Sequence, residues 1–390
     1  MMRKINLLFD LSATQPDKFT IRHGGGIYGE IVFKTILENG YCFDAFYDSN
    51  RWINPDIRFL CEKYQVHLHD LSSCSILDII TNGKYSLIYS PIIGKILSEE
   101  IVYISTLHGL RRIEMPNDWM QLRYGDNNIL SLLHFFFRMT FPSYSRKHKQ
   151  KKVLNTLSKS NVKFVTVSNH SKYSILSTFP EIDVDSVRVF YSPNTSTQTK
   201  CVNPFLCKNK YFMLVSGDRW EKNNLRALMA LDELFSEQEV FNDYCAIITG
   251  VQDLRFYKYK FQNPEKIICK GYVEDDVLKS LYAGCYALIY PSLNEGFGYP
   301  PLEAMRYGKP VIASAITSIP EVCGDAAIYF NPFDYREIKN RILMLTDKGF
   351  YSECSEKACI RYKIISEKQE DDLNALIHWI VSECKNSNNE

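Results

Sequence analysis

The sequence predicts an α/β protein with two doubly wound parallel-sheet domains. Short apolar runs rich in isoleucine, valine, tyrosine and phenylalanine alternate with helix-length segments along nearly the whole chain. The apolar runs are continuous rather than alternating, which indicates strands buried on both faces. The chain has 390 residues, 45% of them hydrophobic, which is enough for two domains with separate cores. Repeated βα alternation of this kind is typical of parallel sheets flanked by helices.

Strand-like runs occur in both halves of the chain. We expect the strands of the first half at residues 4–11, 85–91, 101–109 and 162–168. The strands of the second half are expected at residues 211–217, 244–250, 266–272, 285–292 and 310–314. Because ligands of doubly wound sheets bind beyond the carboxyl ends of the strands, functional residues are expected there.

A polar stretch interrupts the alternation near the middle of the chain. Residues 192–209 contain two prolines and show no helical period, so we predict a linker. This linker separates an N-terminal Rossmann-like domain (1–191) from a C-terminal Rossmann-like domain (210–365). The final residues, 366–390, are expected to form a helix that packs back on the N-terminal domain.

The composition excludes several classes of protein. A formal net charge of +1 argues against nucleic acid as a partner. No apolar run approaches the ~20 residues of a membrane span. The apolar run near the N-terminus reaches Asp10 too soon for a signal peptide, so we expect a cytoplasmic protein. The 12 cysteines include no CxxC pair, and no Cys/His cluster has ligand spacing, so we expect reduced thiols and no zinc site.

The stretch NEGFGYPPLEAMRYGKPVIAS (294–314) combines the features of an anion-binding turn. A glycine–aromatic–glycine turn joins a predicted strand to a short helix, whose free N–H groups favour a phosphate. Gly296 and Gly298 would let the backbone approach a ligand closely. Glu303, in the first helical turn, can accept hydrogen bonds from ribose hydroxyls, and Glu295 can reach the hydroxyls of a sugar. The alternative is a capped helix with acidic residues near its N-terminus.

The same stretch resembles the retaining glycosyltransferases of family 4, which have the GT-B fold. The resemblance rests on EGFGYPPLEAM, followed by GKPVIAS and SIPEVCGDAA, and covers most of the second half of the chain. It implies two Rossmann-like domains facing across a cleft, a nucleotide-sugar donor, and transfer with retention that needs no metal or other cofactor. By motif, the donor would be bound, from its sugar to its ribose, by Glu295, Gly296, Phe297, Gly298 and Glu303.

Two further loops match the family. In VSGDRWEKNNLRAL, Arg219 and Lys222 match the cations that hold the donor diphosphate in this family. Positive charge there stabilises the negative charge that develops as the bond to the sugar breaks. In KGYVEDD, the family receives the base on the backbone of Gly271, Tyr272 and Val273. The alternatives are solvated surface charge for the two cations and a core side chain for Tyr272.

A third, weaker match to the family precedes the first predicted helix. HGGGIYGE contains Gly25, Gly26 and Tyr28 at the place of the family's first glycine loop, which would lie under the donor phosphate or the acceptor. The alternative is a flexible turn.

His108 ends a predicted strand, where the family has a histidine beside the reacting centre. Arg111 and Arg112 follow it and are candidates for binding an anionic acceptor or a phosphate. Many members have an aspartate where this chain has Gly109, which leaves the donor subfamily open. The alternative for His108 is a structural histidine.

A DxD pair occurs at Asp183 and Asp185, the spacing of metal-dependent GT-A transferases. The pair lies in a polar segment away from a nucleotide-binding strand, so we predict a solvated turn.

Residues 129–152 join an apolar, aromatic run to a cluster of lysines, and no acidic residue lies between Asp126 and Glu181. Such a stretch can bind an anionic membrane surface. The alternative is a core helix followed by a solvated basic helix.

These residues predict a retaining glycosyltransferase that moves a sugar from a nucleotide-sugar to a glycan or a polyprenyl-diphosphate-linked acceptor. Its product would be a surface polysaccharide such as O-antigen or capsule. GDP-mannose is the favoured donor, because SIPEVCGDAAIYFNP resembles mannosyl- and rhamnosyltransferase members of the family. The alternatives are a UDP-sugar-dependent transferase or epimerase of the same fold, and a non-catalytic module that binds a glycan or a nucleotide.

Overall fold

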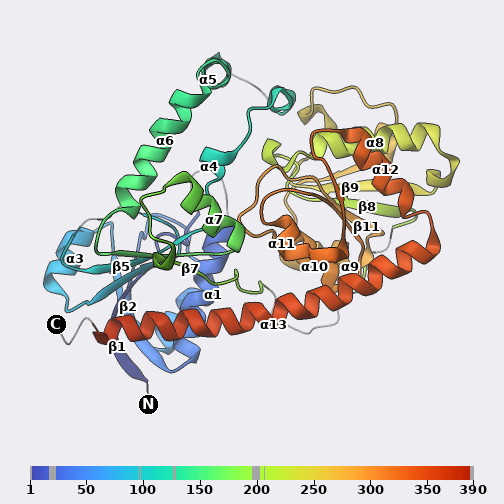
Figure 1. Ribbon diagram of the computed structural model, residues 1–390. Helices are drawn as coiled ribbons and strands as arrows, with labels where there is room; N and C mark the ends of the chain where they lie inside the picture. Colours follow the sequence, from blue (N-terminus) through green and yellow to red (C-terminus); the bar gives the residue numbers. More distant parts are fainter. Residues whose placement is uncertain are drawn as a thin grey trace. The chain divides into compact units, whose positions relative to one another are not determined.

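The computed structural model describes residues 2–16, 23–94, 96, 98–125, 129–195, 203–205 and 207–386. The chain forms two compact units (Figure 1). The first comprises Met1–Leu110, His148–Thr197 and Glu367–Glu390. The second comprises Arg111–Lys147 and Gln198–Ser366.

The first unit is built on a seven-stranded parallel sheet in the order β3-β2-β1-β4-β5-β6-β7. Its strands are β1 (Arg3–Asp10), β2 (Tyr41–Tyr47), β3 (Leu68–Asp70), β4 (Leu87–Ser90), β5 (Val102–Leu107), β6 (Val162–Thr166) and β7 (Val187–Val189). The winding reverses between the neighbours β1 and β4. The loops after these two strands therefore frame the switch point of the sheet.

The second unit repeats this plan with a six-stranded parallel sheet in the order β10-β9-β8-β11-β12-β13. Its strands are β8 (Lys210–Leu214), β9 (Tyr244–Thr249), β10 (Ile267–Lys270), β11 (Ala287–Tyr290), β12 (Val311–Ser314) and β13 (Ala327–Phe330). Here the winding reverses between β8 and β11, which places the switch point after these strands.

The helices connect the strands of each sheet. Those within the first unit are α1 (Gly24–Glu38), α2 (Pro55–Lys63), α3 (Ile76–Asn82) and α7 (Asn169–Thr178). Those within the second are α4 (Arg111–Glu114), α5 (Ile129–Thr140), α8 (Asn224–Glu237), α9 (Asp275–Gly284), α10 (Tyr299–Arg306), α11 (Ile319–Cys323) and α12 (Tyr335–Met344). Two helices, α6 (Pro142–Leu157) and α13 (Lys348–Asn386), contribute residues to both units. Across the described residues, every helix is too short or too polar to span a membrane.

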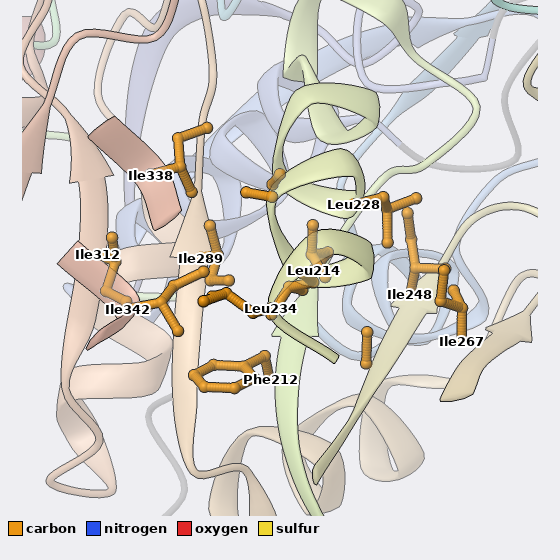
Figure 2. Close-up of a cluster of buried hydrophobic side chains, with 14 of the residues drawn as sticks. Phe212, Leu214, Leu228, Leu234, Ile248, Ile267, Ile289, Ile312, Ile338 and Ile342 are labelled. Atoms are coloured by element: carbon orange, nitrogen blue, oxygen red, sulfur yellow. The ribbon is translucent and has the colours of Figure 1, made fainter. Parts of the chain in front are cut away.

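The core of the second unit holds β8 and β11 in place. Alternate residues of the sheet point to one face, where they pack against apolar side chains of α8 and α12 (Figure 2). The fully buried members include Phe212, Leu214, Leu228, Leu234, Ile289, Ile312, Ile338 and Ile342. Burying each such side chain contributes roughly 1.5–3 kcal/mol, so the strands that precede the switch-point loops are firmly fixed.

The structure confirms the predicted parallel α/β architecture, but four strands were not predicted. β2, β3, β7 and β13 were missed. β3 and β7 have only three residues each, and β13 is buried at only two of its four positions, Ile328 and Phe330. β2 contains Asp44, which interrupts its apolar run. Short or interrupted strands of this kind give little periodic signal, because their neighbours in the sheet supply the stability.

Residues 111–147, which we predicted in the N-terminal domain, group by their contacts with the second unit. Asp118 forms a paired salt bridge with Arg226 of α8, with oxygen–nitrogen distances of 2.6 and 3.1 Å. The Tyr124 hydroxyl accepts a hydrogen bond of 2.9 Å from the amide of Leu225. These contacts lie more than 100 positions apart in sequence, so local sequence patterns do not reveal them.

The C-terminal part of α13 belongs to the first unit. Gln369 donates a 2.5 Å hydrogen bond to the carbonyl of Ser192, and Asp372 accepts a 2.8 Å hydrogen bond from the amide of Tyr191. Of the predicted linker, residues 196–202 and 206 lie outside the described residues. The described remainder contains neither helix nor strand.

We predict that Asp118→Ala lowers the free energy of unfolding of the second unit by about 3 kcal/mol. Its partner Arg226 is only 12% exposed and would be buried without its carboxylate. Urea denaturation followed by circular dichroism measures the loss.

Glu353→Ala is the matched control, because Glu353 and its partner Lys357 are 57% and 41% exposed. This change should cost less than about 0.5 kcal/mol. Equal losses in the two variants would contradict an anchoring role for Asp118.

Candidate functional site

The two loops at the switch point of the second sheet carry the predicted cations and one predicted glutamate. Arg219 and Lys222 follow β8, and Glu295 follows β11. The two strands pair in parallel, with Leu288 opposite Met213. Since their carboxyl ends lie at the same edge of the sheet, the fold joins the three side chains in one charged network.

Glu295 and Lys222 form the buried centre of this network. Their Oε1 and Nζ atoms are 2.5 Å apart, and the side chains are only 7% and 9% exposed. The Nζ atom also donates to the Tyr290 hydroxyl at 3.3 Å. Ser292 Oγ donates to Oε1 of Glu295 at 2.5 Å, and Arg111 Nη2 approaches Oε2 at 3.3 Å. Three side chains therefore donate hydrogen bonds to the carboxylate.

These contacts keep Glu295 ionised. Burial disfavours its charge, but Lys222 and Arg111 outweigh that effect and lower the pKa of the carboxyl to about 2. Burial lowers the pKa of Lys222, and the charge of Glu295 opposes that shift. We therefore expect a charged pair at neutral pH, in which each member compensates the desolvation of the other.

Two arginines and a second glutamate form the outer part of the network. Arg219 Nη2 lies 2.8 Å from Glu221 Oε1, and Arg111 Nη1 lies 3.7 Å from the same oxygen. Burial opposes the charge of Arg219, but Glu221 outweighs it and raises the pKa of the guanidinium. The side chains of Arg219 and Arg111 are 40% and 37% exposed, so they reach solvent. Three cations face two carboxylates in this network, and Asp218 next to it interacts with Arg219 and Glu221 as well.

The glycine–aromatic–glycine turn is held by the loop after β12. Ser318 Oγ donates to the carbonyls of Glu295 and Phe297 at 3.0 and 2.9 Å. Thr317 Oγ1 accepts from the amide of Glu295 at 3.1 Å. Gly298, with a φ of +105°, then turns the chain into α10, a conformation that favours glycine.

Asn223 ties the switch-point loops together. Its backbone is left-handed, with a φ of 56°, which asparagine tolerates better than most residues. Its Nδ2 donates to the carbonyls of Pro291 and Pro332 at 3.1 and 2.8 Å, and its Oδ1 accepts from Arg226 at 2.8 Å. It thereby connects the loops that follow β8, β11 and β13.

Sequence reasoning missed several members of the site. Their only signal was position, because all lie in the loops that follow β8, β11 or β12. They are Glu221, Asn223, Ser292, Thr317 and Ser318.

The other predicted donor-binding residues lie on α10 and after β10. Glu303 is half-buried on α10, and its charge adds to the effect of burial in raising the pKa of Tyr282. Gly271, Tyr272 and Val273 directly follow β10. Tyr272 is 61% exposed, so the core interpretation of that residue is wrong. Its exposure is compatible with a surface for a ligand.

In the first unit, Gly25, Tyr28 and His108 lie together. The rings of Tyr28 and His108 meet edge to face at 4.9 Å. A Cβ atom on Gly25 would lie 3.4 Å from Nε2 of His108 and 3.0 Å from Ile92, and one on Gly26 would lie 2.6 Å from the carbonyl of Thr14. Close packing thus requires glycine at Gly26, the more crowded of the two positions.

His108 is a poor base in this setting. Its Nε2 lies 2.8 Å from the carbonyl of Pro91, which fixes the ring. Burial lowers its pKa to about 4, and the neighbouring His23 adds to the shift. Neutral His108 therefore donates its one N–H, on Nε2, to the carbonyl of Pro91 and offers Nδ1 as a hydrogen-bond acceptor at neutral pH. Of the two predicted arginines that follow, Arg111 joins the charged network and Arg112 is exposed on α4.

The DxD pair forms the solvated turn that we predicted. Asp183 caps a short 3₁₀ helix by accepting a hydrogen bond from the amide of Asp185, and both residues are exposed. Within the described ranges, no three or more His, Cys, Asp or Glu side chains are grouped so as to hold a metal ion.

Comparison with known proteins shows which family the second half of the chain resembles. Residues 200–361 match the family "Glycosyl transferases group 1". The serotype-specific mannosyltransferase WbdA of Escherichia coli is 46% identical over 95 residues, which are 24% of this chain and 12% of WbdA. The O-antigen chain mannosyltransferase RfbU of Salmonella typhimurium is 31% identical over 178 residues, 46% of this chain and 49% of RfbU. The chain thus spans half or less of these relatives.

Solved structures show the same fold over nearly the whole chain. A glycosyltransferase from Rickettsia africae superposes with a TM-score of 0.63 at 16% identity, covering 98% of both chains. WaaG, a glycosyltransferase involved in lipopolysaccharide biosynthesis, gives a TM-score of 0.63 at 12% identity and covers 96% of this chain and 99% of its own. The predicted GT-B fold is confirmed.

We predict that Glu295→Gln removes part of the acid sensitivity of the second unit. The pKa of Glu295 is about 2 in the folded chain and 4.5 without perturbation. Its contribution to stability is therefore complete above about pH 4.5 and is lost as the pH falls toward 2. The stability difference between wild type and Glu295→Gln should shrink by about 2 kcal/mol between about pH 6 and pH 3.

Urea denaturation at several pH values measures this difference. The control is Glu274→Gln, which changes an exposed glutamate at the start of α9. Its difference from wild type should stay within about 0.5 kcal/mol at every pH, because this charge is exposed. A constant difference for Glu295→Gln as well would contradict the ion pair.

Proposed function

We propose that this chain, which carries a glycosyl transferases group 1 domain at residues 200–361, is a retaining, metal-independent glycosyltransferase of surface polysaccharide biosynthesis. The observation that carries the proposal is the network of Arg111, Arg219, Lys222 and Glu295 at the switch point of the second sheet. Doubly wound sheets bind nucleotides at this point, and the guanidinium groups of Arg219 and Arg111, which reach solvent, suit a diphosphate.

The donor that we propose is a nucleotide-sugar, with GDP-mannose favoured. The relatives WbdA and RfbU are described as mannosyltransferases, and RfbU acts on O-antigen chains by its name. The acceptor is accordingly a glycan or a polyprenyl-diphosphate-linked oligosaccharide. A UDP-sugar is the alternative donor, since HepE of Anabaena, which has a similar fold, has been solved with UDP and glucose.

The proposed reaction breaks the bond between the anomeric carbon of the sugar and the terminal phosphate oxygen. The electron pair stays on the diphosphate, and the acceptor oxygen forms the new bond on the same face of the sugar. Arg219 and Lys222 stabilise the charge that develops on the diphosphate, so no divalent ion is needed in that role. No side chain acts as a covalent nucleophile, and the acceptor proton leaves with the diphosphate.

Binding of the donor follows the motif assignments. Glu303 holds the ribose, the backbone at Gly271 to Val273 receives the base, and the turn from Gly296 to Gly298 faces the phosphate side. Glu295 orients the sugar while it stays bound to Lys222. The family resemblance also assigns His108 to the donor sugar, and the Nδ1 atom of its neutral ring can accept a hydrogen bond from a sugar hydroxyl.

A panel of GDP-, UDP- and dTDP-sugars in a thermal shift assay tests donor class and metal dependence together. A ligand that binds only the folded chain should raise the melting temperature by about 5 °C or more at roughly 100 times its Kd. We expect stabilisation by GDP-mannose with or without EDTA. Stabilisation that EDTA abolishes would overturn the metal-independent site, and a response only to UDP-sugars would replace the donor.

We predict that Arg219→Ala and Glu303→Ala separate turnover from donor binding. Arg219→Ala should lower kcat roughly 10²–10³-fold, because it removes charge stabilisation from the transition state. Glu303→Ala should raise the donor Kd roughly tenfold and leave kcat nearly unchanged, because it removes a hydrogen bond to bound ribose. Steady-state kinetics and calorimetry measure the two constants.

Arg255→Ala is the control for these variants, since Arg255 is 91% exposed and pairs only with Asp253 among the described ion pairs. It should leave both constants unchanged. Wild-type kinetics in Arg219→Ala and Glu303→Ala would remove the site assignment.

A further inference from the structure

Exposed apolar side chains are concentrated in the segment from Trp119 to Tyr144, where their contact with water is unfavourable. It contains eight of the twenty large hydrophobic residues that are exposed in the described part of the chain. They are Trp119, Ile129, Leu130, Leu133, Phe136, Phe137, Phe141 and Tyr144. Concentrated exposure of this kind marks an interaction surface, whereas apolar residues scattered singly do not.

One face of α5 anchors the helix. Phe135 is only 2% exposed and packs edge to face against Trp119 at 5.2 Å. Arg138 donates to Oε1 of Gln121 at 2.8 Å, and its carbonyl accepts from Asn117 at 3.0 Å. These contacts fix which side of α5 faces its own unit.

The opposite face of α5 presents an apolar stripe, formed by Leu130, Leu133, Phe137, Phe141 and Tyr144. The first four follow the i, i+3, i+7, i+11 spacing of one helical face. The ring of Phe137 contacts those of Phe141 and Tyr144, with centroids 5.4 and 6.0 Å apart. The stripe therefore continues from α5 into the first turn of α6.

A basic cluster follows the stripe directly. On α6, Tyr144, Lys147 and Lys151 share one face by their i, i+3, i+7 spacing. Arg146, Lys147, Lys151 and Lys152 are all exposed. No acidic residue occurs between positions 126 and 181, so the sequence provides no local charge to neutralise them.

We infer that the stripe and the basic cluster together dock the chain on an anionic phospholipid surface. The aromatic and leucine side chains would enter the boundary between headgroups and acyl chains, and the cations would bind lipid phosphates. Charge complementarity selects this occupant. A second copy of the chain would bring four further cations to the same place, whereas an anionic bilayer compensates them. The inference does not depend on the proposed sugar transfer.

Co-sedimentation of the full chain with vesicles tests the inference. Phosphatidylcholine vesicles with and without phosphatidylglycerol distinguish an anionic surface from a neutral one. We expect binding to the phosphatidylglycerol vesicles only, weakened by salt. Each cation near such a surface contributes roughly fivefold in affinity, so reversing the four charges of Arg146, Lys147, Lys151 and Lys152 to glutamate should weaken binding by more than about 100-fold.

The matched control reverses Lys84, Lys260, Lys348 and Lys363, four exposed lysines elsewhere on the chain. This variant has the same net charge as the test variant and should still bind. A third variant, Phe137→Ser with Phe141→Ser, keeps every charge and should also lose binding, because it removes the apolar contact. Thermal melting of each variant separates lost binding from lost folding.

Three results would overturn the inference. One is that the wild-type chain does not sediment with the vesicles, and another is that the control and the basic-cluster variant lose binding equally. The third is a concentration-dependent dimer that the Phe137→Ser, Phe141→Ser variant abolishes, without vesicle binding. That result would assign the stripe to self-association.

Discussion

The buried ion pair of Lys222 and Glu295 sets the main constraint on the second unit. A charge removed from water costs several kcal/mol unless a partner and hydrogen bonds replace the lost solvent. Here the carboxylate has donors from Lys222, Ser292 and Arg111, and the ammonium has the Tyr290 hydroxyl in addition. Because neither charge is tolerable alone, the loops after β8 and β11 must stay in register with each other.

The surrounding structure is organised to keep that register. The apolar core under α8 and α12 fixes the two strands, but it does not determine the course of the loops beyond them (Figure 2). Asn223 makes this connection by hydrogen bonds to the carbonyls of Pro291 and Pro332, and Ser318 does so at the glycine turn. Hydrophobic burial thus supplies stability, and directional polar contacts supply the geometry of the site.

The separate contributions of hydrophobic burial and of polar contacts explain what the sequence could and could not predict. Continuous apolar runs predicted nine strands and the parallel sheets, the glycine turn after a strand pointed to Glu295, and the family resemblance pointed to Arg219 and Lys222. The sequence did not predict the roles of Glu221 and Asn223, whose partners Arg111 and Pro332 lie about 110 positions away in the chain. It also did not predict that residues 111–147 group with the second unit. Local sequence patterns do not reveal such pairs, because their members come together only when the chain folds.

The distribution of exposure within the network argues for different roles of its cations. Lys222 is buried and bound to Glu295. If Lys222 moved toward a ligand, the carboxylate of Glu295, which is only 7% exposed, would lose its main partner. Arg219 reaches solvent and pairs with Glu221, a contact that water can replace at little cost, whereas Arg111 also donates to the buried carboxylate of Glu295. Under the proposed function, an arriving diphosphate would therefore draw Arg219 away from Glu221 and leave Arg111 on Glu295. Lys222 would act at a fixed position through its charge, and Glu295 would stay in place to face the sugar.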